Sequence, residues 1–404
     1  MPILPSNTPA VALRPEAEVL LCCARTQMDA VRAERLRVLL GEKLDWDYVL
    51  GTAQQHGMTP LLYWHLHATC PEAVPSMVLA DLQDDFRANA QYNVFLMGKL
   101  LQLLRLFEAH HIPAVPFKGP MLATCAYGNL ALRAFSDLDI LIHQRDVTRA
   151  KALLLSQGYS LRYPLPGAQA SAHLHAYHAY TFAGSDGAVN VDLHWRFAPR
   201  HHAFSLGLEH VWERLEQVGL AGTTIFNIAP EDLLLILCMH GAKDGWTRLI
   251  WICDIATLIR LHRQMDWACM IKQAGALGSE RRLFLGLLLA HNLLAADLPQ
   301  DVLHRILTHA GVKSLATQVC ERLFYTPDRV AEVIGEMALH LRLMECLQDQ
   351  AIYFRYRLCQ MLTPNRRDRA LLALPVCLSF LYYLLRPFRL LKTYGLRNRH
   401  WLGH

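Results

Sequence analysis

Apolar positions recur at three- and four-residue intervals from residue 16 to about residue 110. This spacing places them on one face of an α-helix, so the pattern predicts a helical region, with its strongest amphipathic stretch at residues 94–107. From Ile112 the pattern changes to PAVPFKGP, which is short, β-prone and interrupted by proline and glycine. We therefore predict a strand that ends in a turn here, at the start of a mixed α/β region.

Alternation of polar and apolar residues then predicts strands. Residues 135–142 (FSDLDILI) alternate in this way, as expected for a strand with one face on a core and the other facing a cleft. Residues 177–182 and 188–195 form two further strand-like runs, and the Gly-Ser-Asp-Gly between them predicts a hairpin. Short helices are predicted at residues 121–127 and 146–157.

The order of these elements predicts an α+β fold, with a small mixed β-sheet flanked by helical regions at both ends of the chain. From Pro230 onward the chain again has the pattern of helices, and a chain of 404 residues is long enough for more than one domain. We predict three parts: residues 1–111 as an N-terminal helical cap, 112–227 as the α+β core, and 228–404 as a C-terminal helical region.

The composition excludes a disordered or fibrous chain, since 53% of residues are hydrophobic and only 19% are charged. A formal net charge of +5 is too small for a dedicated nucleic-acid binder, so any polyanion binding must be local. The eleven cysteines contain no CxxC motif and mostly occupy apolar helical patterns, which indicates reduced thiols. Because the N-terminus does not resemble a secretory signal, the expected location is the cytoplasm.

Residues 370–385 contain no charge and are bracketed by arginine and lysine. This stretch is shorter than the roughly 20 residues of a spanning helix and is interrupted by Pro375. We favour a buried or docking helix, with an interfacial membrane contact or a true span as alternatives. The basic residues that follow, up to residue 399, could extend a peripheral membrane or partner contact, or meet RNA.

Three aspartates carry the main chemical hypothesis. Asp137 and Asp139 share one face of their predicted strand, because side chains alternate along a strand, and two like charges so close together call for a cation between them. Asp192 lies on the second strand of the hairpin and could complete a three-carboxylate site. Such a site can hold two Mg²⁺ ions, with Mn²⁺ as a possible substitute. Asp137 and Asp139 would hold the nucleotide metal, and Asp192 would hold the second metal and act as base.

The residues before this strand resemble an anion-binding turn. Gly119 stands where a strand meets a short helix, so that the backbone and the helix amides can approach a phosphate, and Lys118 and Arg133 add positive charge. Pro120 has no N–H to offer, so the grip on a triphosphate would depend on these charges or on the other amides. We assign nucleotide binding to Lys118, Gly119, Arg133 and Ser136.

The run from FKGPMLATCAYGNLALRAFSDLDILI to LLLSQGY, followed by VNVDLHW, resembles an uncharacterised nucleotidyltransferase family within the DNA polymerase β-like superfamily. The pattern of that superfamily is a strand, a G-[GS] turn, a Dh[DE]h strand and a later acidic strand, which Gly119, Asp137, Asp139 and Asp192 match. The resemblance extends from about residue 44 to residue 391. It implies Mg²⁺-dependent transfer of a nucleoside monophosphate (NMP) from an NTP to an acceptor hydroxyl. The acceptor stays open: a small molecule, a protein or an RNA.

Other classes of function were weighed against this one. A DxD glycosyltransferase would need a Rossmann-like half before the DxD motif, where this chain has helical patterns, so it is the less favoured rival. A catalytically silent module that senses nucleotides or binds a partner stays an alternative. Walker A and GxSxG motifs are absent from the sequence.

Histidines offer further candidates, for most of which a structural role is favoured. His173, His175 and His178 have no nearby cysteine to complete a zinc site. His194 shares the strand face of Asp192 and could contact substrate, but a hydrogen-bonded structural histidine is the favoured interpretation. The polar residues around His240 could line an acceptor cleft or form a satisfied seam between two helices, and we favour the seam.

Overall fold

The computed structural model describes residues 13–163, 173–202, 204, 206–220, 222–324, 329–363, 381–383 and 386. The chain forms two compact units, residues 1–326 and 327–404. The fold of the first unit is α+β, as the sequence predicts. The described part of the second unit contains the helices α16 (Arg329–Leu343) and α17 (Leu347–Leu362).

The apolar segment at residues 370–385 lies outside the described residues except for 381–383. Among the helices that the structure describes, none has the length and apolar character to cross a membrane. The predicted three-part division of the chain stays a prediction; both of its internal boundaries lie within the first compact unit.

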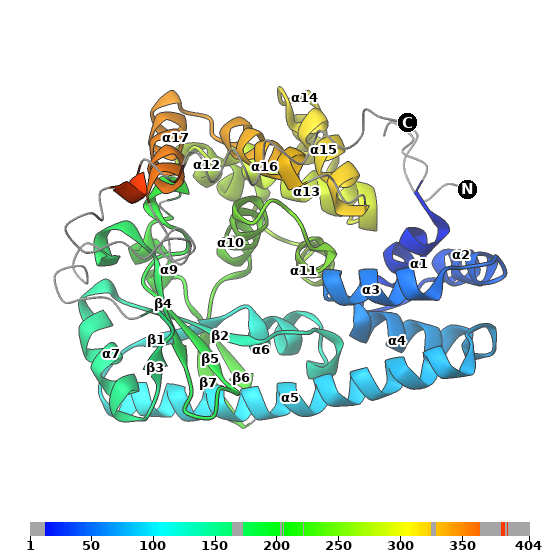
Figure 1. Ribbon diagram of the computed structural model, residues 1–404, viewed down its shortest axis with the longest axis horizontal. Coiled ribbons are helices and arrows are strands. Elements are labelled where there is room, and N and C mark those ends of the chain that lie inside the picture. Colours follow the sequence, from blue (N-terminus) through cyan, green and yellow to red (C-terminus); the bar gives the residue numbers. More distant parts are fainter. Residues whose placement is uncertain are drawn as a thin grey trace. The chain divides into compact units, whose positions relative to one another are not determined.

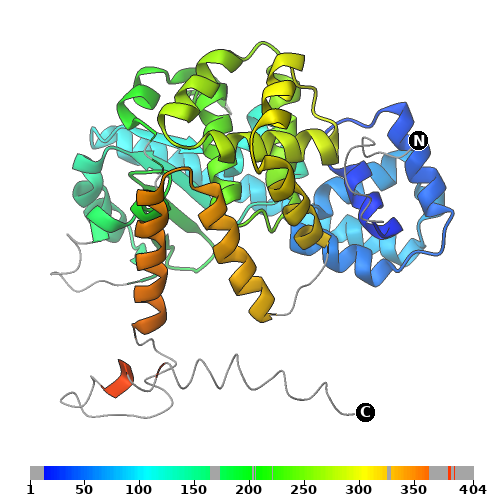
Figure 2. The same ribbon diagram turned by 90° about the horizontal axis from the view of Figure 1, so that it is seen from above.

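The predicted N-terminal helical region is a set of helices that ends in one long helix, α5. Short polar side chains begin two of these helices: Asp29 accepts a hydrogen bond from the Arg32 amide, and Asp45 accepts one from the Tyr48 amide. The first four helices gather at the N-terminal end of α5 (Figure 1 and Figure 2). The helices are α1 (Pro15–Cys23), α2 (Ala30–Leu40), α3 (Trp46–His56), α4 (Thr59–Thr69) and α5 (Ser76–Ala109), with a 3₁₀ turn η1 (Pro71–Ala73).

Five strands form the mixed sheet in the order β1-β2-β5-β4-β3. Only β2 and β5 run parallel; the other neighbouring pairs are antiparallel, and β4 and β5 are the predicted hairpin. The strands are β1 (Ala114–Phe117), β2 (Asp137–Ile142), β3 (Ser160–Leu161), β4 (Ala179–Ala183) and β5 (Asn190–His194). The short helical elements between them are α6 (Gly119–Met121), η2 (Leu122–Ala126), η3 (Leu130–Leu132), η4 (Gln144–Asp146) and α7 (Val147–Ser156).

One face of this sheet packs on α5 and α7. Leu138, Ile140 and Ile142 of β2 form a core with Phe107 of α5 and Leu154 of α7, and all five side chains are buried. Figure 1 shows α5 running along the sheet on this side. Because strand side chains alternate, the residues between the apolar ones, Asp137 and Asp139 among them, face the other way.

Helices of the region after the sheet lie over its opposite face, where α10 lies above β2 in the view of Figure 1 and α11 contacts η2. Trp246 is fully buried here, and Gly241 of α10 makes room for it, since a Cβ at Gly241 would lie 2.4 Å from the indole ring. The elements are η5 (Arg200–His202), α9 (Leu208–Glu213), the hairpin β6 (Glu216–Leu220) with β7 (Thr223–Asn227), α10 (Pro230–Lys243), α11 (Leu249–Leu261), α12 (Trp267–Ala276), α13 (Glu280–Leu294), α14 (Gln300–Thr308) and α15 (Val312–Phe324). The sequence analysis did not predict the β6–β7 hairpin.

Candidate functional site

The structure brings the three aspartates to one face of the sheet. Asp139 of β2 pairs in register with Asp192 of β5, and Asp137 pairs with Asn190, two residues earlier on each strand. Paired residues on neighbouring strands project to the same side, so the parallel β2–β5 pair places the carboxylates of Asp139 and Asp192 next to each other. Segments far apart in the chain thus meet at a single acidic face.

A histidine joins two of these aspartates. Asp139, Asp192 and His194 each offer a ligand atom, and these three atoms lie within 4.8 Å of one another. The Nε2 atom of His194 lies 2.8 Å from Oδ1 of Asp139. Oδ1 of Asp192 is shielded from solvent and has no hydrogen-bond partner. A buried carboxylate oxygen without a partner is costly, so this donor set fits a divalent cation. Asp137 lies outside the three-atom set.

Lys118 reaches the same carboxylates from the turn after β1. Its Nζ lies 3.0 Å from Oδ1 of Asp139. The turn is tight, because Lys118 has a φ of 56° and Gly119 a φ of 34°, and a Cβ at Gly119 would lie 3.2 Å from the carbonyl oxygen of Asp137. Lys118 and Gly119 are therefore placed directly against the start of β2. A positive φ at a non-glycine residue is a strained conformation of the kind that concentrates at functional sites.

Burial and neighbouring charges shift the pKa values of the ionisable side chains at this face. Burial raises the pKa of Asp137 to about 6, and the neighbouring Asp139 carboxylate adds to the effect. Burial would also raise the pKa of Asp139, but Lys118 and His194 outweigh it and hold that pKa well below its usual range. Burial opposes the charge of Lys118, yet Asp139 and Asp137 raise the pKa of its ammonium. The face therefore holds an Asp139 that stays ionised beside an Asp137 that takes up a proton as the pH falls through about 6.

Arg133, expected to contact phosphate, is held by a different carboxylate. Its Nε and Nη2 atoms each donate to an oxygen of Asp254 at 2.8 Å, and the Tyr127 hydroxyl donates to the same carboxylate at 2.7 Å. Asp254 lies on α11, so this buried contact joins the loop before β2 to the C-terminal helices. Ser136 is exposed immediately before β2. The structure therefore gathers Lys118 and Gly119 at the acidic face and gives two donors of Arg133 to Asp254.

The sequence analysis favoured a hydrogen-bonded structural histidine for His194, and the structure pairs its Nε2 with Oδ1 of Asp139. The same Nε2 belongs to the group of atoms that could hold a metal ion. The available signal was its position two residues after Asp192, on the same strand face. Among the described residues, the group of metal-type ligands includes none of His173, His175 or His178. The ring of His173 stacks on Tyr177 and Tyr180 instead.

The polar residues around His240, for which the sequence analysis favoured a seam between two helices over an acceptor cleft, make two contacts at the end of α10. His240 Nδ1 lies 3.3 Å from a carboxylate oxygen of Asp244, and Lys243 Nζ lies 2.8 Å from the other. Burial, with Lys118 and Lys243 nearby, lowers the pKa of His240 well below its ordinary value, which leaves the ring neutral. These residues form a paired polar seam whose neutral histidine lies near the acidic face.

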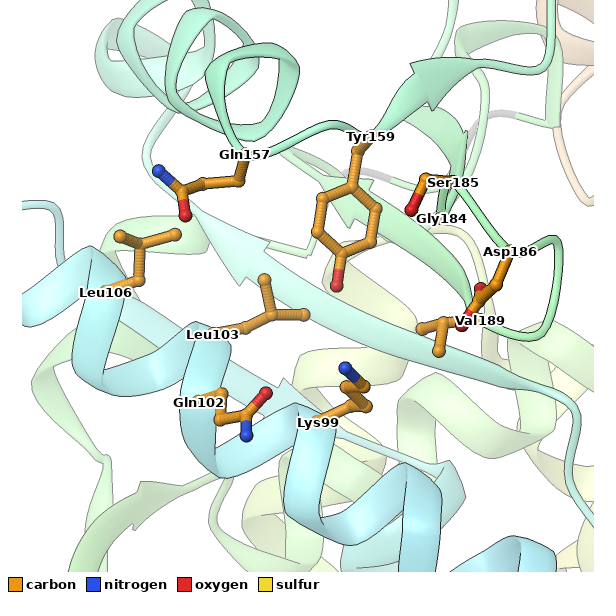
Figure 3. A pocket seen from close by; sticks show the side chains of 10 residues that line it. All are labelled: Lys99, Gln102, Leu103, Leu106, Gln157, Tyr159, Gly184, Ser185, Asp186 and Val189. Carbon is orange, nitrogen blue, oxygen red and sulfur yellow. The ribbon is translucent and has the colours of Figure 1, made fainter.

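A separate cavity of about 310 Å³ lies between α5 and the Gly184–Val189 turn. Figure 3 shows the amine of Lys99 and the hydroxyl of Tyr159 pointing into the same space. Its lining includes Leu103 of the apolar core but none of the three site aspartates. The aspartates that the sequence predicts as site residues therefore lie at the acidic face and not in this cavity.

Comparison with known proteins gives one match. The sequence model of a family described as an uncharacterised nucleotidyltransferase matches residues 42–295, which is more than half of the chain. The matched region runs from α3 to α13 and contains the whole acidic face. No curated protein and no solved structure matches the chain.

Proposed function

Because the chain belongs to an uncharacterised nucleotidyltransferase family, we propose that it transfers an NMP from an NTP to an acceptor hydroxyl, with release of pyrophosphate and dependence on a divalent cation such as Mg²⁺. One observation carries this proposal beyond the family match. Asp139 and Asp192 lie side by side on parallel strands, and Oδ1 of Asp192 is buried without a partner. A cation between the two carboxylates satisfies that oxygen and offsets the repulsion.

The three aspartates have distinct roles in the proposal. Asp137 and Asp139 hold the cation that accompanies the nucleotide, and Asp192 helps to hold a second one. Bound cations neutralise charge on the phosphates and lower the barrier to attack by the acceptor oxygen. Asp192 also takes the proton of the acceptor hydroxyl, on the carboxylate oxygen that does not hold the cation.

Lys118 and Gly119 form the phosphate end of the site. Gly119 lets the backbone pass against β2, and a side chain there would press on the Asp137 carbonyl. The ammonium of Lys118 pairs with Asp139 in the absence of nucleotide, and in this proposal it exchanges that contact for a phosphate oxygen when an NTP binds. Arg133 contributes positive charge at longer range. Although it is paired with Asp254, its charge lowers the pKa of Asp137.

The proposal is tested with the four NTPs, each labelled at the α-phosphate, and Mg²⁺. Transfer of label is followed to the protein itself, to total RNA and to a small-molecule extract, together with release of pyrophosphate. Asp139→Asn is expected to reduce transfer about a thousandfold, whereas Asp84→Asn, the same change on an exposed helix aspartate, is expected to leave it intact. Nucleotide binding without turnover in calorimetry would favour a nucleotide-sensing module and contradict the proposed transfer.

A further inference from the structure

His194 is an imidazole among carboxylates. It is buried at the end of β5, and its Nε2 faces Oδ1 of Asp139 at 2.8 Å. Its Nδ1 lies 3.4 Å from the backbone carbonyl oxygen of Arg196. A histidine that ligates a metal typically directs its other ring nitrogen to a backbone carbonyl or a carboxylate, which fixes the tautomer. His194 has the geometry for this arrangement: Nδ1 faces the carbonyl, and Nε2 faces the site, where a bound cation would replace the hydrogen bond from Nε2 to Asp139.

The surroundings of the ring fix its orientation. The edge of Phe117 packs against it at a centroid distance of 5.1 Å, and the ring of His178 lies 5.5 Å away on another side. The strand register places His194 opposite Leu141, one step beyond the Asp139–Asp192 pair on the same face. The imidazole is therefore held in place before any ligand arrives, as a preorganised ligand requires.

We propose that His194 is a metal ligand alongside Asp139 and Asp192, and that its imidazole makes this site prefer a first-row transition metal such as Mn²⁺ over Mg²⁺. The inference rests on the proposed function, since it concerns the cation site of that reaction. Mg²⁺ strongly favours oxygen ligands, whereas imidazole nitrogen suits transition metals. A set of two carboxylates and one imidazole therefore still accepts Mg²⁺, but binds Mn²⁺ more tightly than an all-oxygen site would.

The test uses the full-length protein and Mn²⁺ alone, followed by electron paramagnetic resonance, with Mg²⁺ added as competitor. Mn²⁺ bound by an imidazole shows a hyperfine coupling to ¹⁴N in pulsed measurements. We expect this coupling in the wild type and expect it to disappear in His194→Asn. That amide can still reach the Arg196 carbonyl, but it offers nothing at the position of Nε2. The same change should weaken Mn²⁺ binding by about tenfold to a hundredfold and Mg²⁺ binding much less.

Two further variants keep the test decisive. His178→Asn removes a neighbouring imidazole that lies outside the donor set, so the ¹⁴N coupling should persist. His194→Gln places an amide oxygen near the former Nε2. It should retain metal binding, lose the directly bonded nitrogen signal and show a smaller preference for Mn²⁺ over Mg²⁺. Retained metal binding in this variant would show that weaker binding in His194→Asn comes from the lost ligand and not from a damaged fold.

The outcomes distinguish this inference from the proposed function. Mn²⁺ that binds without ¹⁴N coupling, or with a coupling unchanged in His194→Asn, would overturn the role of His194 and leave the proposed transfer standing. No binding of Mn²⁺ or Mg²⁺ by the wild type, with or without a non-hydrolysable NTP, would overturn both. Coupling that is lost in His194→Asn and kept in His178→Asn is the expected result.

Discussion

Two buried carboxylate clusters lie close together in this protein, and they are built in opposite ways. Around Asp254, both oxygens are engaged, by two donors of Arg133 and by the Tyr127 hydroxyl. Around Asp139, the contacts from Lys118 and His194 both fall on Oδ1. The adjacent Asp192 keeps a buried oxygen with no partner. Arg133 and Asp137 are only four positions apart, so the loop before β2 links the two clusters.

The difference distinguishes a carboxylate that is fully paired within the fold from one to which we assign catalysis in the proposed function. The Asp254 cluster is closed: its charge is paired, and it ties the loop to α11. The Asp139 cluster is open, because it holds more negative charge than its own lysine and histidine satisfy. A buried ion pair with satisfied oxygens is costly to break, whereas an incompletely satisfied group marks a place where a ligand completes the structure.

The largest effect is expected from Asp139→Asn, which tests whether the open cluster carries the activity. Removing its charge deprives the proposed cation site of its central carboxylate, and we expect NMP transfer to fall about 10³-fold, since several kcal/mol of transition-state stabilisation are lost. The measurement is the initial rate of pyrophosphate release. Asp84→Asn is the matched control, and a rate for Asp139→Asn within a few-fold of the control would show that the open cluster is not catalytic.

Asp254→Ala tests whether the closed cluster is structural. The change strands the Arg133 guanidinium without a partner in the interior, and we expect a loss of about 3–5 kcal/mol in the free energy of unfolding, measured by denaturant titration. Replacing both partners, Arg133→Met with Asp254→Leu, should recover much of it. If the double variant is stable yet binds NTP normally, the proposed contribution of Arg133 to nucleotide binding is wrong.

Tyr127→Phe removes only one donor from the closed cluster. Its hydroxyl donates to Oδ1 of Asp254, and a hydrogen bond to a charged group contributes about 1.5–3 kcal/mol. We expect a loss of that size in the free energy of unfolding, and a rate of NMP transfer that stays close to that of the wild type. A large loss of rate with unchanged stability would mean that the two clusters are not separate in function.

The smallest effect concerns Asp137 and pH. Its pKa in the fold, about 6, exceeds the ordinary value of 3.8, so the fold favours the protonated carboxyl. Ionisation therefore costs stability, and the cost appears as pH rises from about 4 through 6. In metal-free protein, Asp137→Asn should be more stable than the wild type at pH 8 by about 1–2 kcal/mol, since solvent reduces the effect at this half-buried position. The two proteins should converge near pH 4.

Thermal unfolding across pH 4–8 in the presence of a chelator measures this difference. An excess stability of the variant that stays constant over the whole pH range would show that ionisation of Asp137 is not its cause. Adding Mn²⁺ at pH 8 should stabilise the wild type more than the variant, because the cation offsets the charge that the variant lacks.

Much of the fold could be predicted from the sequence, because local patterns reveal strands and helices. The alternation in FSDLDILI predicts β2, and the Gly-Ser-Asp-Gly turn predicts the β4–β5 hairpin, whose strands pair as expected. The β6–β7 hairpin was not predicted, because its strands are largely exposed and show little alternation of polar and apolar residues. The predicted helix at residues 370–385 lies almost wholly outside the described residues.

The candidate site was only partly predictable, because its key contacts join distant segments. The shared face of Asp137 and Asp139 follows from strand geometry alone. The pairing of Arg133 with Asp254 does not, since 121 residues separate them and no local pattern reveals a buried partner on a distant helix. The same holds for the ring of His194, whose meaning depends on Asp139, 55 residues earlier.

The parallel pairing of β2 and β5 requires a crossover between two fixed strands, and the described part of this crossover includes η4, α7, β3 and β4. Alignment of Asp139 with Asp192 is set by the ladder between those strands, not by the length of the excursion that links them. We therefore expect the surface turns of the crossover to tolerate changes in length and sequence while the acidic pair keeps its alignment, whereas α7 and β4 are constrained because they supply Leu154 and Phe182 to the core. We expect differences in acceptor specificity to accumulate in this crossover, where the sequence can change without moving Asp139 and Asp192.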